Sequence, residues 1–154
     1  MEFEDIFYQN ANFKIIKDKK YGTGSFGCVY KAEKEGDEKI YAAKILKSEI
    51  GFDGDMQMMF LREALILGNL HHPSILKLQG INFQSNTDGN KIEPTIMTEF
   101  LSHGSLKDNI NKERNHNSDK NWTATKKYII LLGISDAMRY LHELGILHRD
   151  LKPQ

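Results

Sequence analysis

Three glycines near the amino end, Gly22, Gly24 and Gly27, have the spacing G-x-G-x-x-G in the stretch YGTGSFGCVYKA. Glycine has no Cβ, so backbone amides in such a stretch can approach phosphate oxygens closely. A glycine-rich hairpin turn without a ligand explains the same residues. A dinucleotide-binding fold is disfavoured, because it needs a helix at the third glycine, whereas CVYKAE predicts a strand. The spacing therefore favours a hairpin flap over phosphates.

The first hundred residues combine strand patterns with one helical pattern. Strands are predicted at 13–21, 27–33 and 39–46, and the polar turn KEGDE joins the last two. A helix is predicted from about Asp55 to Leu70, with Asp53 or Asp55 as its cap. Two further strands, ILKLQGINF and PTIMTEF, are separated by the turn-rich segment QSNTDGN.

The remaining residues predict helices. A short one lies near 105–112, and a long one at about 123–144 has Thr123 or Thr125 as its cap and Gly145 at its end. The apolar stripe of the long helix is wide, so we expect it to pack against protein over much of its circumference. The stripe comprises Ile130, Leu131, Ile134, Ala137, Met138, Leu141 and Leu144.

A lysine and a glutamate occupy positions that predict an ion pair. Lys44 shares one face of its strand with Ile40, Ala42 and Leu46. An exposed strand edge explains such a lysine equally well. However, Glu63 lies on an apolar helix face, and a carboxylate that points toward a core needs a cation. We therefore expect Lys44 to pair with Glu63 and to present its ammonium group to phosphate oxygens.

Composition narrows the class of protein. The 21 basic and 21 acidic residues balance, so the charge gives no support for nucleic-acid binding. Cys28 is the single cysteine, which excludes an internal disulfide and fits a reducing compartment. No apolar run approaches a membrane span and no signal peptide is recognised, so a cytoplasmic location is expected. His71 and His72 precede Pro73 in a turn and are not expected to bind a metal.

Five motifs in order resemble the eukaryotic protein kinases. They are the glycine motif with Val29, the pair Ala42-x-Lys44, the helix glutamate Glu63, the segment TEFLSHGSL and the run HRDLKP at 148–153. Each motif alone is weak, but five in this order are specific. The resemblance covers residues 13–154. The lysine of HRDLKP is typical of serine/threonine kinases and TEFLSHGSL of tyrosine kinases, a mixture similar to the tyrosine-kinase-like group.

The resemblance implies an α+β, two-lobed fold with a five-stranded antiparallel small lobe and one helix. Residues 1–98 would form the small lobe, with an extension at 1–12. Residues 99–104 would be the hinge, and 105–154 the first helices of an incomplete large lobe.

The resemblance also implies where ATP binds. The glycine loop would cover the phosphates, and Lys44 would meet the α- and β-phosphates. Val29 and Ala42 would form the roof over the adenine. The remaining contacts would come from the gatekeeper Thr98, the backbone of Glu99 and Leu101, and Ser105 near the ribose. Tyr21 departs from the family pattern, which has Leu, Ile or Val before the first glycine.

Asp150 and Lys152 are the residues to which the resemblance assigns chemistry. Asp150 would orient a substrate hydroxyl and accept its proton, and Lys152 would offset charge on the moving phosphoryl group. Arg149 resembles the arginine that pairs with a phosphorylated activation loop, and a structural salt bridge is the alternative. The expected reaction is ATP- and Mg²⁺-dependent phosphorylation of protein serine or threonine.

The chain ends inside the catalytic-loop pattern, at Gln154. In the family pattern the residues that hold Mg²⁺ follow this point, so none of the residues present is assigned as a metal ligand. We therefore expect a kinase fragment that is inactive alone. The alternatives are a pseudokinase or a naturally short, non-catalytic module that docks on a kinase lobe or a scaffold protein through its long helix.

Overall fold

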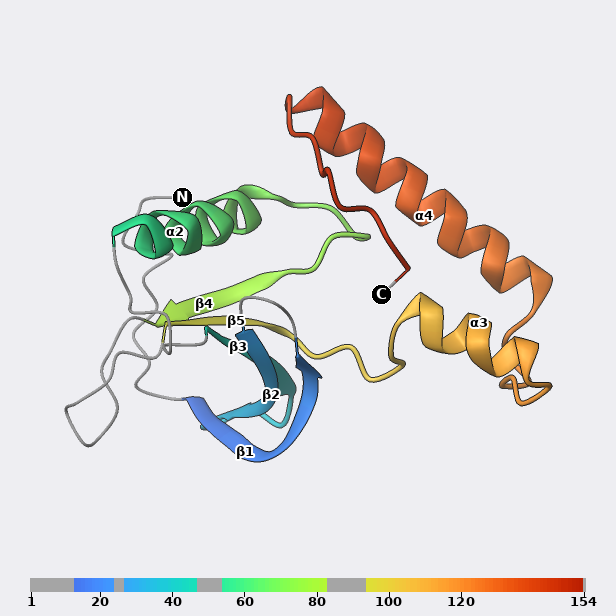
Figure 1. Cartoon of the computed structure of the whole chain (residues 1–154), viewed down its shortest axis with the longest axis horizontal. Coiled ribbons are helices and arrows are strands. Elements are labelled where there is room, and N and C mark those ends of the chain that lie inside the picture. Colours follow the sequence, from blue (N-terminus) through green and yellow to red (C-terminus); the bar gives the residue numbers. More distant parts are fainter. Residues whose placement is uncertain (1–12, 24–26, 47–53, 83–93, 154) are drawn as a thin grey trace. The chain divides into compact units, whose positions relative to one another are not determined.

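The structure is a computed structural model that describes residues 13–23, 27–46, 54–82 and 94–153 of the 154-residue chain. Figure 1 shows its elements in chain order. Their bounds are β1 (Phe13–Thr23), β2 (Gly27–Lys34), β3 (Ile40–Leu46), α2 (Gly54–Asn69), β4 (Leu78–Asn82), β5 (Thr95–Glu99), α3 (Leu106–Arg114) and α4 (Ala124–Glu143). The extension 1–12 and the turn-rich segment QSNTDGN at 84–90 lie outside the described residues.

The five strands of the described chain form one antiparallel sheet in the order β1-β2-β3-β5-β4. The predicted α+β fold with a five-stranded antiparallel sheet and one helix is therefore confirmed. The turn between β2 and β3 contains Gly36, whose φ of 77° suits a residue without a Cβ. Strand β3, at the centre of the sheet, carries the predicted lysine.

Side chains of β3 alternate between two apolar clusters on opposite faces of the sheet. On one face Leu46 packs with Phe60, Ala64, Ile81 and Ile96. On the other, Tyr41 and Ala43 pack with Ala32 and Met97. The predicted division of this strand, with Ala42, Lys44 and Leu46 on one face, agrees with this packing.

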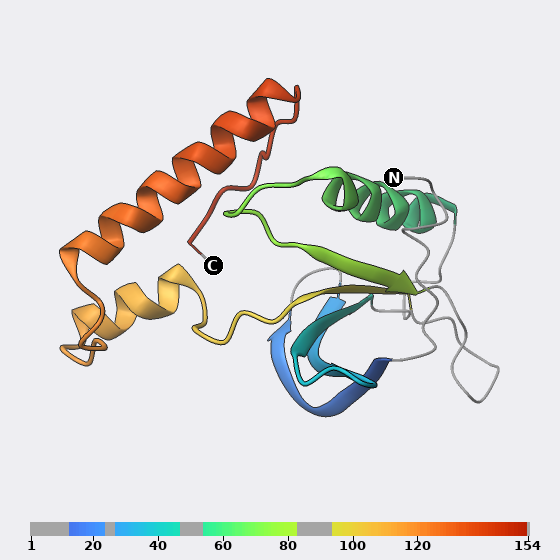
Figure 2. The ribbon, with the colours of Figure 1, turned by 180° about the vertical axis from the view of Figure 1, so that it is seen from behind.

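Helix α2 lies along β4 in both views of the ribbon (Figures 1 and 2). Phe60 and Ala64 of the helix pack with Ile81 of β4, so α2 covers the face of the sheet that includes Lys44. Of its two predicted caps, Asp53 lies outside the described residues. Asp55 lies within the first turn, where a carboxylate interacts favourably with the helix dipole.

Strand β4 is shorter than the predicted 75–83, because it begins at Leu78. Ile75 instead closes a turn, in which its N–H donates to the carbonyl oxygen of His72 at 3.1 Å. Pro73 lies inside that turn, where its fixed φ and missing N–H are tolerated. Apolar residues alone could not distinguish the turn from the strand.

Helices α3 and α4 agree closely with their predicted ranges. Ser105 caps α3, and Thr123 caps α4 by accepting a hydrogen bond from the Lys126 N–H at 3.2 Å. Gly145 follows α4 with a φ of 72°. The expected burial of α4 is only partly correct. Ala137 and Leu141 are buried, whereas other members of the predicted stripe, Leu131 and Leu144, are more than half exposed.

The chain divides into two compact units, which are described separately below. The first comprises residues 1–71 and 76–100, and the second comprises 72–75 and 101–154. In the second unit the chain after α4 turns back, and the Lys107 N–H donates to the carbonyl oxygen of Pro153 at 2.7 Å (Figure 1). Within the described ranges, no helix combines the length and apolar character needed to cross a membrane.

Candidate functional site

Three of the predicted nucleotide-binding residues form a row across the sheet of the first unit. Gly22 of β1 is paired with Val29 of β2, and Val29 is paired with Lys44 of β3. Directly opposed residues on neighbouring strands point to the same face of the sheet. The glycine segment, the apolar Val29 and the lysine therefore share one face. Gly24 lies outside the described residues.

The two described glycines of the motif have different surroundings. A Cβ on Gly27 would clash with the carbonyl oxygen of Ile45, because β2 and β3 approach closely there. A Cβ on Gly22 would meet the Val29 side chain at 3.7 Å, an ordinary van der Waals contact. Gly27 is thus required by the sheet itself, whereas Gly22 leaves space on the face that holds Lys44.

Lys44 and Glu63 form the predicted ion pair. The Lys44 Nζ donates to Glu63 Oε1 at 2.6 Å, so the central strand is joined to α2. The two side chains remain 34% and 47% exposed, so Glu63 borders the core rather than pointing into it. Because the pair is open to solvent, the Lys44 ammonium group can also meet a further anion.

Ala42 and Thr98 are paired across β3 and β5, two residues along from Lys44. Ala42 is partly buried, and its small side chain leaves room over the sheet. Thr98 is buried, with its hydroxyl donating to the carbonyl oxygen of Glu99 at 3.3 Å. The same face of the sheet therefore continues from the lysine to the end of β5.

Glu99, at the end of β5, is fixed by two hydrogen bonds to Lys77. Its side-chain Oε1 accepts from the Lys77 N–H at 2.9 Å, and its own N–H donates to the Lys77 carbonyl oxygen at 3.4 Å. The next residue, Phe100, makes an edge-to-face contact with Tyr21 of β1. Neither the Lys77 bonds nor this aromatic contact was predicted, because each joins segments far apart in the sequence.

Leu101 and Ser105 belong to the second unit. Leu101 is 66% exposed. The Ser105 hydroxyl accepts from the Asp108 N–H at 3.1 Å, and the Asp108 carboxylate accepts from the Ser105 N–H at 2.9 Å. The Ser105 hydroxyl also donates to Asp108 Oδ2 at 2.7 Å. This bond, followed by that from the Ser105 backbone N–H, holds the pKa of Asp108 below its usual value. The spacing S-x-x-D signals this capping box, but sequence reasoning missed it.

The segment after α4 folds into a compact loop around Asp150. Arg149 has a left-handed φ of 59°, which is uncommon for a residue with a Cβ and costs on the order of 1 kcal/mol. The Asp150 N–H donates to the His148 ring Nδ1 at 3.3 Å. Lys152 Nζ lies 2.7 Å from Asp150 Oδ2. The loop therefore holds an exposed carboxylate beside an ammonium group.

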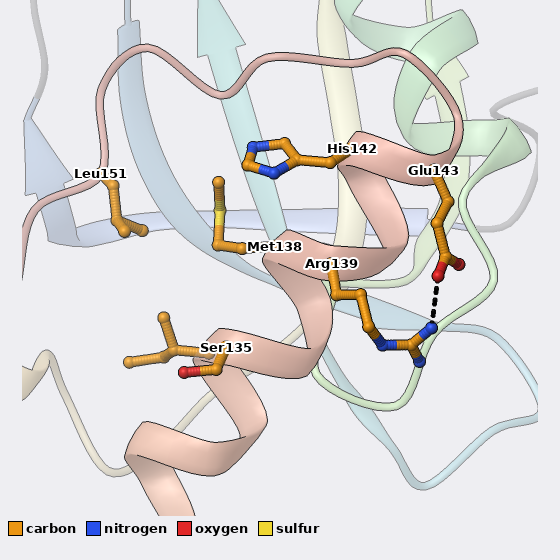
Figure 3. A pocket seen from close by; sticks show the side chains of 7 residues that line it. Ser135, Met138, Arg139, His142, Glu143 and Leu151 are labelled. Carbon is orange, nitrogen blue, oxygen red and sulfur yellow. Dashed lines mark hydrogen bonds and ion pairs between the residues drawn. The ribbon is translucent and has the colours of Figure 1, made fainter.

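A hollow of about 690 Å³ lies between α4 and this returning segment. In Figure 3 Met138 and His142 project from α4 into the space bordered by Leu151. Arg139 donates to Glu143 at 2.6 Å at its rim. None of the predicted site residues lines it.

The described residues contain no cluster of three or more His, Cys, Asp or Glu side chains able to hold a metal ion. The described residues therefore do not form a Mg²⁺ site by themselves. Both ring nitrogens of His72 contact protein groups: Nε2 lies 3.0 Å from Asp136 Oδ2, and Nδ1 accepts from the Ser74 N–H at 3.1 Å.

Comparison with solved structures identifies the fold as that of protein kinases. The crystal structure of Rad53 1–466 in complex with AMP-PNP matches with a TM-score of 0.68 and 30% identity, covering 92% of this chain and 33% of that one. The family model described as "Protein kinase domain" matches residues 15–154. The chain therefore belongs to the protein kinase family.

Relatives of two kinds are similar to this chain. Ephrin type-B receptor 1 of Gallus gallus is 35% identical over 149 residues, which cover 94% of this chain and 14% of the receptor. Calcium/calmodulin-dependent protein kinase type IV of Homo sapiens is 33% identical over 155 residues, which cover 97% of this chain and 29% of the relative. The chain thus spans less than a third of the length of either relative.

Proposed function

We propose that this chain carries the ATP-binding residues and part of the catalytic loop of an ATP-dependent protein kinase that phosphorylates serine or threonine. The ion pair between Lys44 and Glu63 is the observation that carries the proposal. A lysine held at 2.6 Å by a helix carboxylate, in a row with Gly22 and Val29, presents a fixed cation beside a segment whose glycine leaves room for phosphates.

The nucleotide contacts are those that membership of the protein kinase family implies. Lys44 binds the α- and β-phosphates beneath the glycine segment of Gly22, Gly24 and Gly27. Val29 and Ala42 pack on the adenine, with Thr98 as the gatekeeper. The backbone of Glu99 and Leu101 and the side chain of Ser105 complete the contacts. The Ser105 hydroxyl already caps α3, so a ribose contact has to share it with Asp108.

In the catalytic loop, Asp150 orients the substrate hydroxyl and accepts its proton as the bond to phosphorus forms. Lys152, whose ammonium group forms an ion pair with Asp150, offsets the charge that develops on the phosphoryl group. Protein kinases in general use ATP with Mg²⁺, whose charge neutralises the phosphates. The relatives include both calcium/calmodulin-dependent and ephrin-receptor kinases, so they do not decide between serine/threonine and tyrosine. The proposed serine/threonine specificity therefore rests on Lys152.

The domain organisation and the location are part of the same proposal. Residues 1–98 act as the small lobe, 99–104 as the hinge and 105–154 as the first part of the large lobe. In support, β5 ends at Glu99, α3 begins at Leu106, and the residues between them form neither helix nor strand. The cytoplasm supplies ATP and keeps a free thiol such as Cys28 reduced.

The test begins with ATP binding to the 154-residue chain. Replacing Lys44 with Met removes the cation, and we expect ATP affinity to fall about tenfold or more. Lys14→Met, at an exposed position of β1, makes the same change in charge and should leave the affinity unchanged. Equal ATP binding by Lys44→Met and the unmodified chain would contradict the proposal.

Phosphoryl transfer is then measured on the protein in the length that its source cell makes. Asp150→Asn should slow transfer by about 100-fold or more, because a carboxamide does not accept the hydroxyl proton. Analysis of the phosphorylated residues should find phosphoserine or phosphothreonine. Phosphotyrosine alone would overturn the specificity and leave the kinase assignment standing.

A second candidate is a non-catalytic module that docks on a kinase lobe or a scaffold protein. It is favoured by four apolar residues of α4 that are each more than half exposed, namely Tyr128, Ile129, Leu131 and Leu132. Failure to bind ATP, together with a stable complex on sedimentation that is lost in Ile129→Ser, would support this candidate. A monomer that binds ATP would count against it.

A further inference from the structure

A hollow of about 620 Å³ lies in the second unit, where α3 and the loop after it meet the start of α4 (Figure 1). Its volume is within the range of about 300–1,000 Å³ that is typical of ligand sites. None of the residues assigned above to ATP or to phosphoryl transfer lines it. We call it the α3–α4 pocket. Its charged and large apolar lining residues are Leu106, Lys112, Asp119, Trp122, Lys126 and Ile130.

The walls of the α3–α4 pocket are held in place by hydrogen bonds within the second unit. The Trp122 indole N–H donates to Glu113 Oε2 at 2.8 Å. Lys127 Nζ donates to the other oxygen of the same carboxylate at 2.7 Å, so the end of α3 is joined to the start of α4. The Asn109 side-chain amide donates to the Ser105 carbonyl oxygen at 2.9 Å and so fixes the segment before α3. Because these walls are already ordered, a ligand would not have to order them.

Positive charge dominates the α3–α4 pocket. Lys112 and Lys126 contribute two ammonium groups, against the single carboxylate of Asp119. Among the described residues the Lys126 ammonium group forms no ion pair, whereas that of the next residue, Lys127, is paired with Glu113. Helix α4 also begins without an acidic residue in its first turn, although the helix dipole favours one there. The start of α4 therefore presents uncompensated positive charge to the pocket.

Apolar side chains lie beside these ammonium groups. Leu106, Trp122 and Ile130 are each partly buried, so part of their apolar surface remains available in the pocket. Asn121, also in the lining, has a carboxamide that can both donate to and accept from a peptide backbone. A peptide segment that carries acidic and aromatic side chains combines the groups that match this lining.

We propose that the α3–α4 pocket is a docking site for an acidic peptide segment of a protein partner. A carboxylate of the segment binds Lys112 and Lys126, and a neighbouring aromatic side chain packs on Trp122 and Ile130. The inference goes beyond the proposed function, because docking here requires neither ATP nor the residues that bind it. In a protein kinase, such a site selects a protein substrate by a segment away from the phosphorylated residue.

The experiment measures peptide binding to the full 154-residue chain by tryptophan fluorescence. Trp122 is the single tryptophan and lines the pocket, so its emission reports directly on occupancy. The probe is a capped peptide in which glutamates flank one phenylalanine. Replacing its glutamates by glutamines should raise the Kd about tenfold, and replacing its phenylalanine by serine should raise it about threefold. Binding should also weaken as salt is added, because salt screens the charges.

Lys126→Glu tests the charge without weakening the helix. A glutamate in the first turn of α4 interacts favourably with the helix dipole, so unfolding of α4 does not explain a loss of binding. We expect the Kd for the acidic peptide to rise about tenfold or more, and Lys112→Gln to raise it about threefold. Lys107→Glu makes the same charge reversal in the first turn of α3, outside the pocket, and should leave the Kd unchanged. Thermal unfolding checks that each variant folds.

The outcomes distinguish this inference from the proposed function. Equal binding of the acidic and the glutamine peptides, or unchanged binding in Lys126→Glu, would overturn the docking site. Binding of phenylpropionate as tightly as the acidic peptide would also overturn it, because the pocket would then be a site for a small aromatic acid. A chain that binds ATP but not the acidic peptide refutes docking and leaves the proposed function standing. A chain that binds the peptide but not ATP gives the reverse result.

Discussion

Gly27 lies at a point where β2 and β3 approach so closely that a side chain would meet the carbonyl oxygen of Ile45. Backbone cannot move aside as the end of a long side chain can, so a Cβ there would strain the sheet. Gly22 belongs to the same motif, but a Cβ at this position would lie at an ordinary contact distance of 3.7 Å from the Val29 side chain. Within one motif, therefore, the packing of the sheet requires glycine at position 27 but not at position 22.

Substitution by alanine should therefore affect stability differently at the two positions. Gly27→Ala should lower the free energy of unfolding by about 1–3 kcal/mol through overpacking. Gly22→Ala should change it by less than about 0.5 kcal/mol, since its Cβ fits. Urea unfolding of both variants measures the difference, and equal losses would show that the close approach of β2 and β3 is not what requires Gly27.

The ion pair between Lys44 and Glu63 is also a feature of single residues, with little expected effect on stability. Both side chains are about one-third to one-half exposed. Exposed pairs of this kind contribute about 0–1 kcal/mol, because solvent screens them. The loss of ATP affinity expected in Lys44→Met should therefore occur in a chain that still folds.

At the scale of the element, the two helices of the second unit begin with different caps. Ser105 caps α3 together with the carboxylate of Asp108, and this bond lowers the pKa of Asp108. Thr123 caps α4 through the Lys126 N–H, with no acidic residue in the first turn. Only the start of α3 thus depends on the ionisation of a carboxylate within its cap.

The cap of α3 should weaken in acid. A carboxyl group whose pKa is lowered by folding contributes stability above its unfolded pKa and loses it as pH falls through its folded pKa. Amide exchange in the first turn of α3 should therefore accelerate, relative to that of α4, below about pH 4. In Asp108→Asn this difference should no longer depend on pH. The same pH dependence in the variant would exclude Asp108 as its cause.

At the scale of the whole molecule, the chain enters the second unit twice. Residues 72–75 belong to it, although the residues on either side, 71 and 76, belong to the first unit. His72 holds this short segment on α4. Its Nε2 lies 3.0 Å from Asp136 Oδ2, its ring stacks on Tyr140 at 5.2 Å, and its Nδ1 accepts from the Ser74 N–H at 3.1 Å.

Removing this ring should loosen α4. His72→Ala loses the stacking and both hydrogen bonds of a side chain that is only 8% exposed, so we expect the second unit to lose about 1–3 kcal/mol of stability. Amide exchange near Asp136 and Tyr140 should accelerate. His71→Ala is the matched control, because the His71 ring lies 3.2 Å from the Asn69 carbonyl oxygen of the first unit. Equal protection of α4 in both variants would refute this role of His72.

Local patterns were enough to predict most elements. Periodicity identified β1, α2 and α4, because a two-residue or 3.6-residue repeat is visible within each segment. The start of β4 could not be predicted, because an apolar residue such as Ile75 is compatible with a strand as well as with the turn that it closes with His72. The exposure of Leu131 and Leu144 also escaped prediction, because a helical stripe does not reveal what lies against it.

The sequence by itself determined the order of the strands and helices along the chain, the faces of β3 and the pairing of Lys44 with Glu63. These follow from short repeats and from the cost of leaving a carboxylate without a cation near a core. Tertiary structure alone decided the contacts of Tyr21 with Phe100 and of His72 with Asp136. Tyr21 and Phe100 are 79 residues apart in the sequence, and His72 and Asp136 are 64 residues apart. The curvature of the sheet brings the first pair together, and the return of the chain to α4 brings the second pair together.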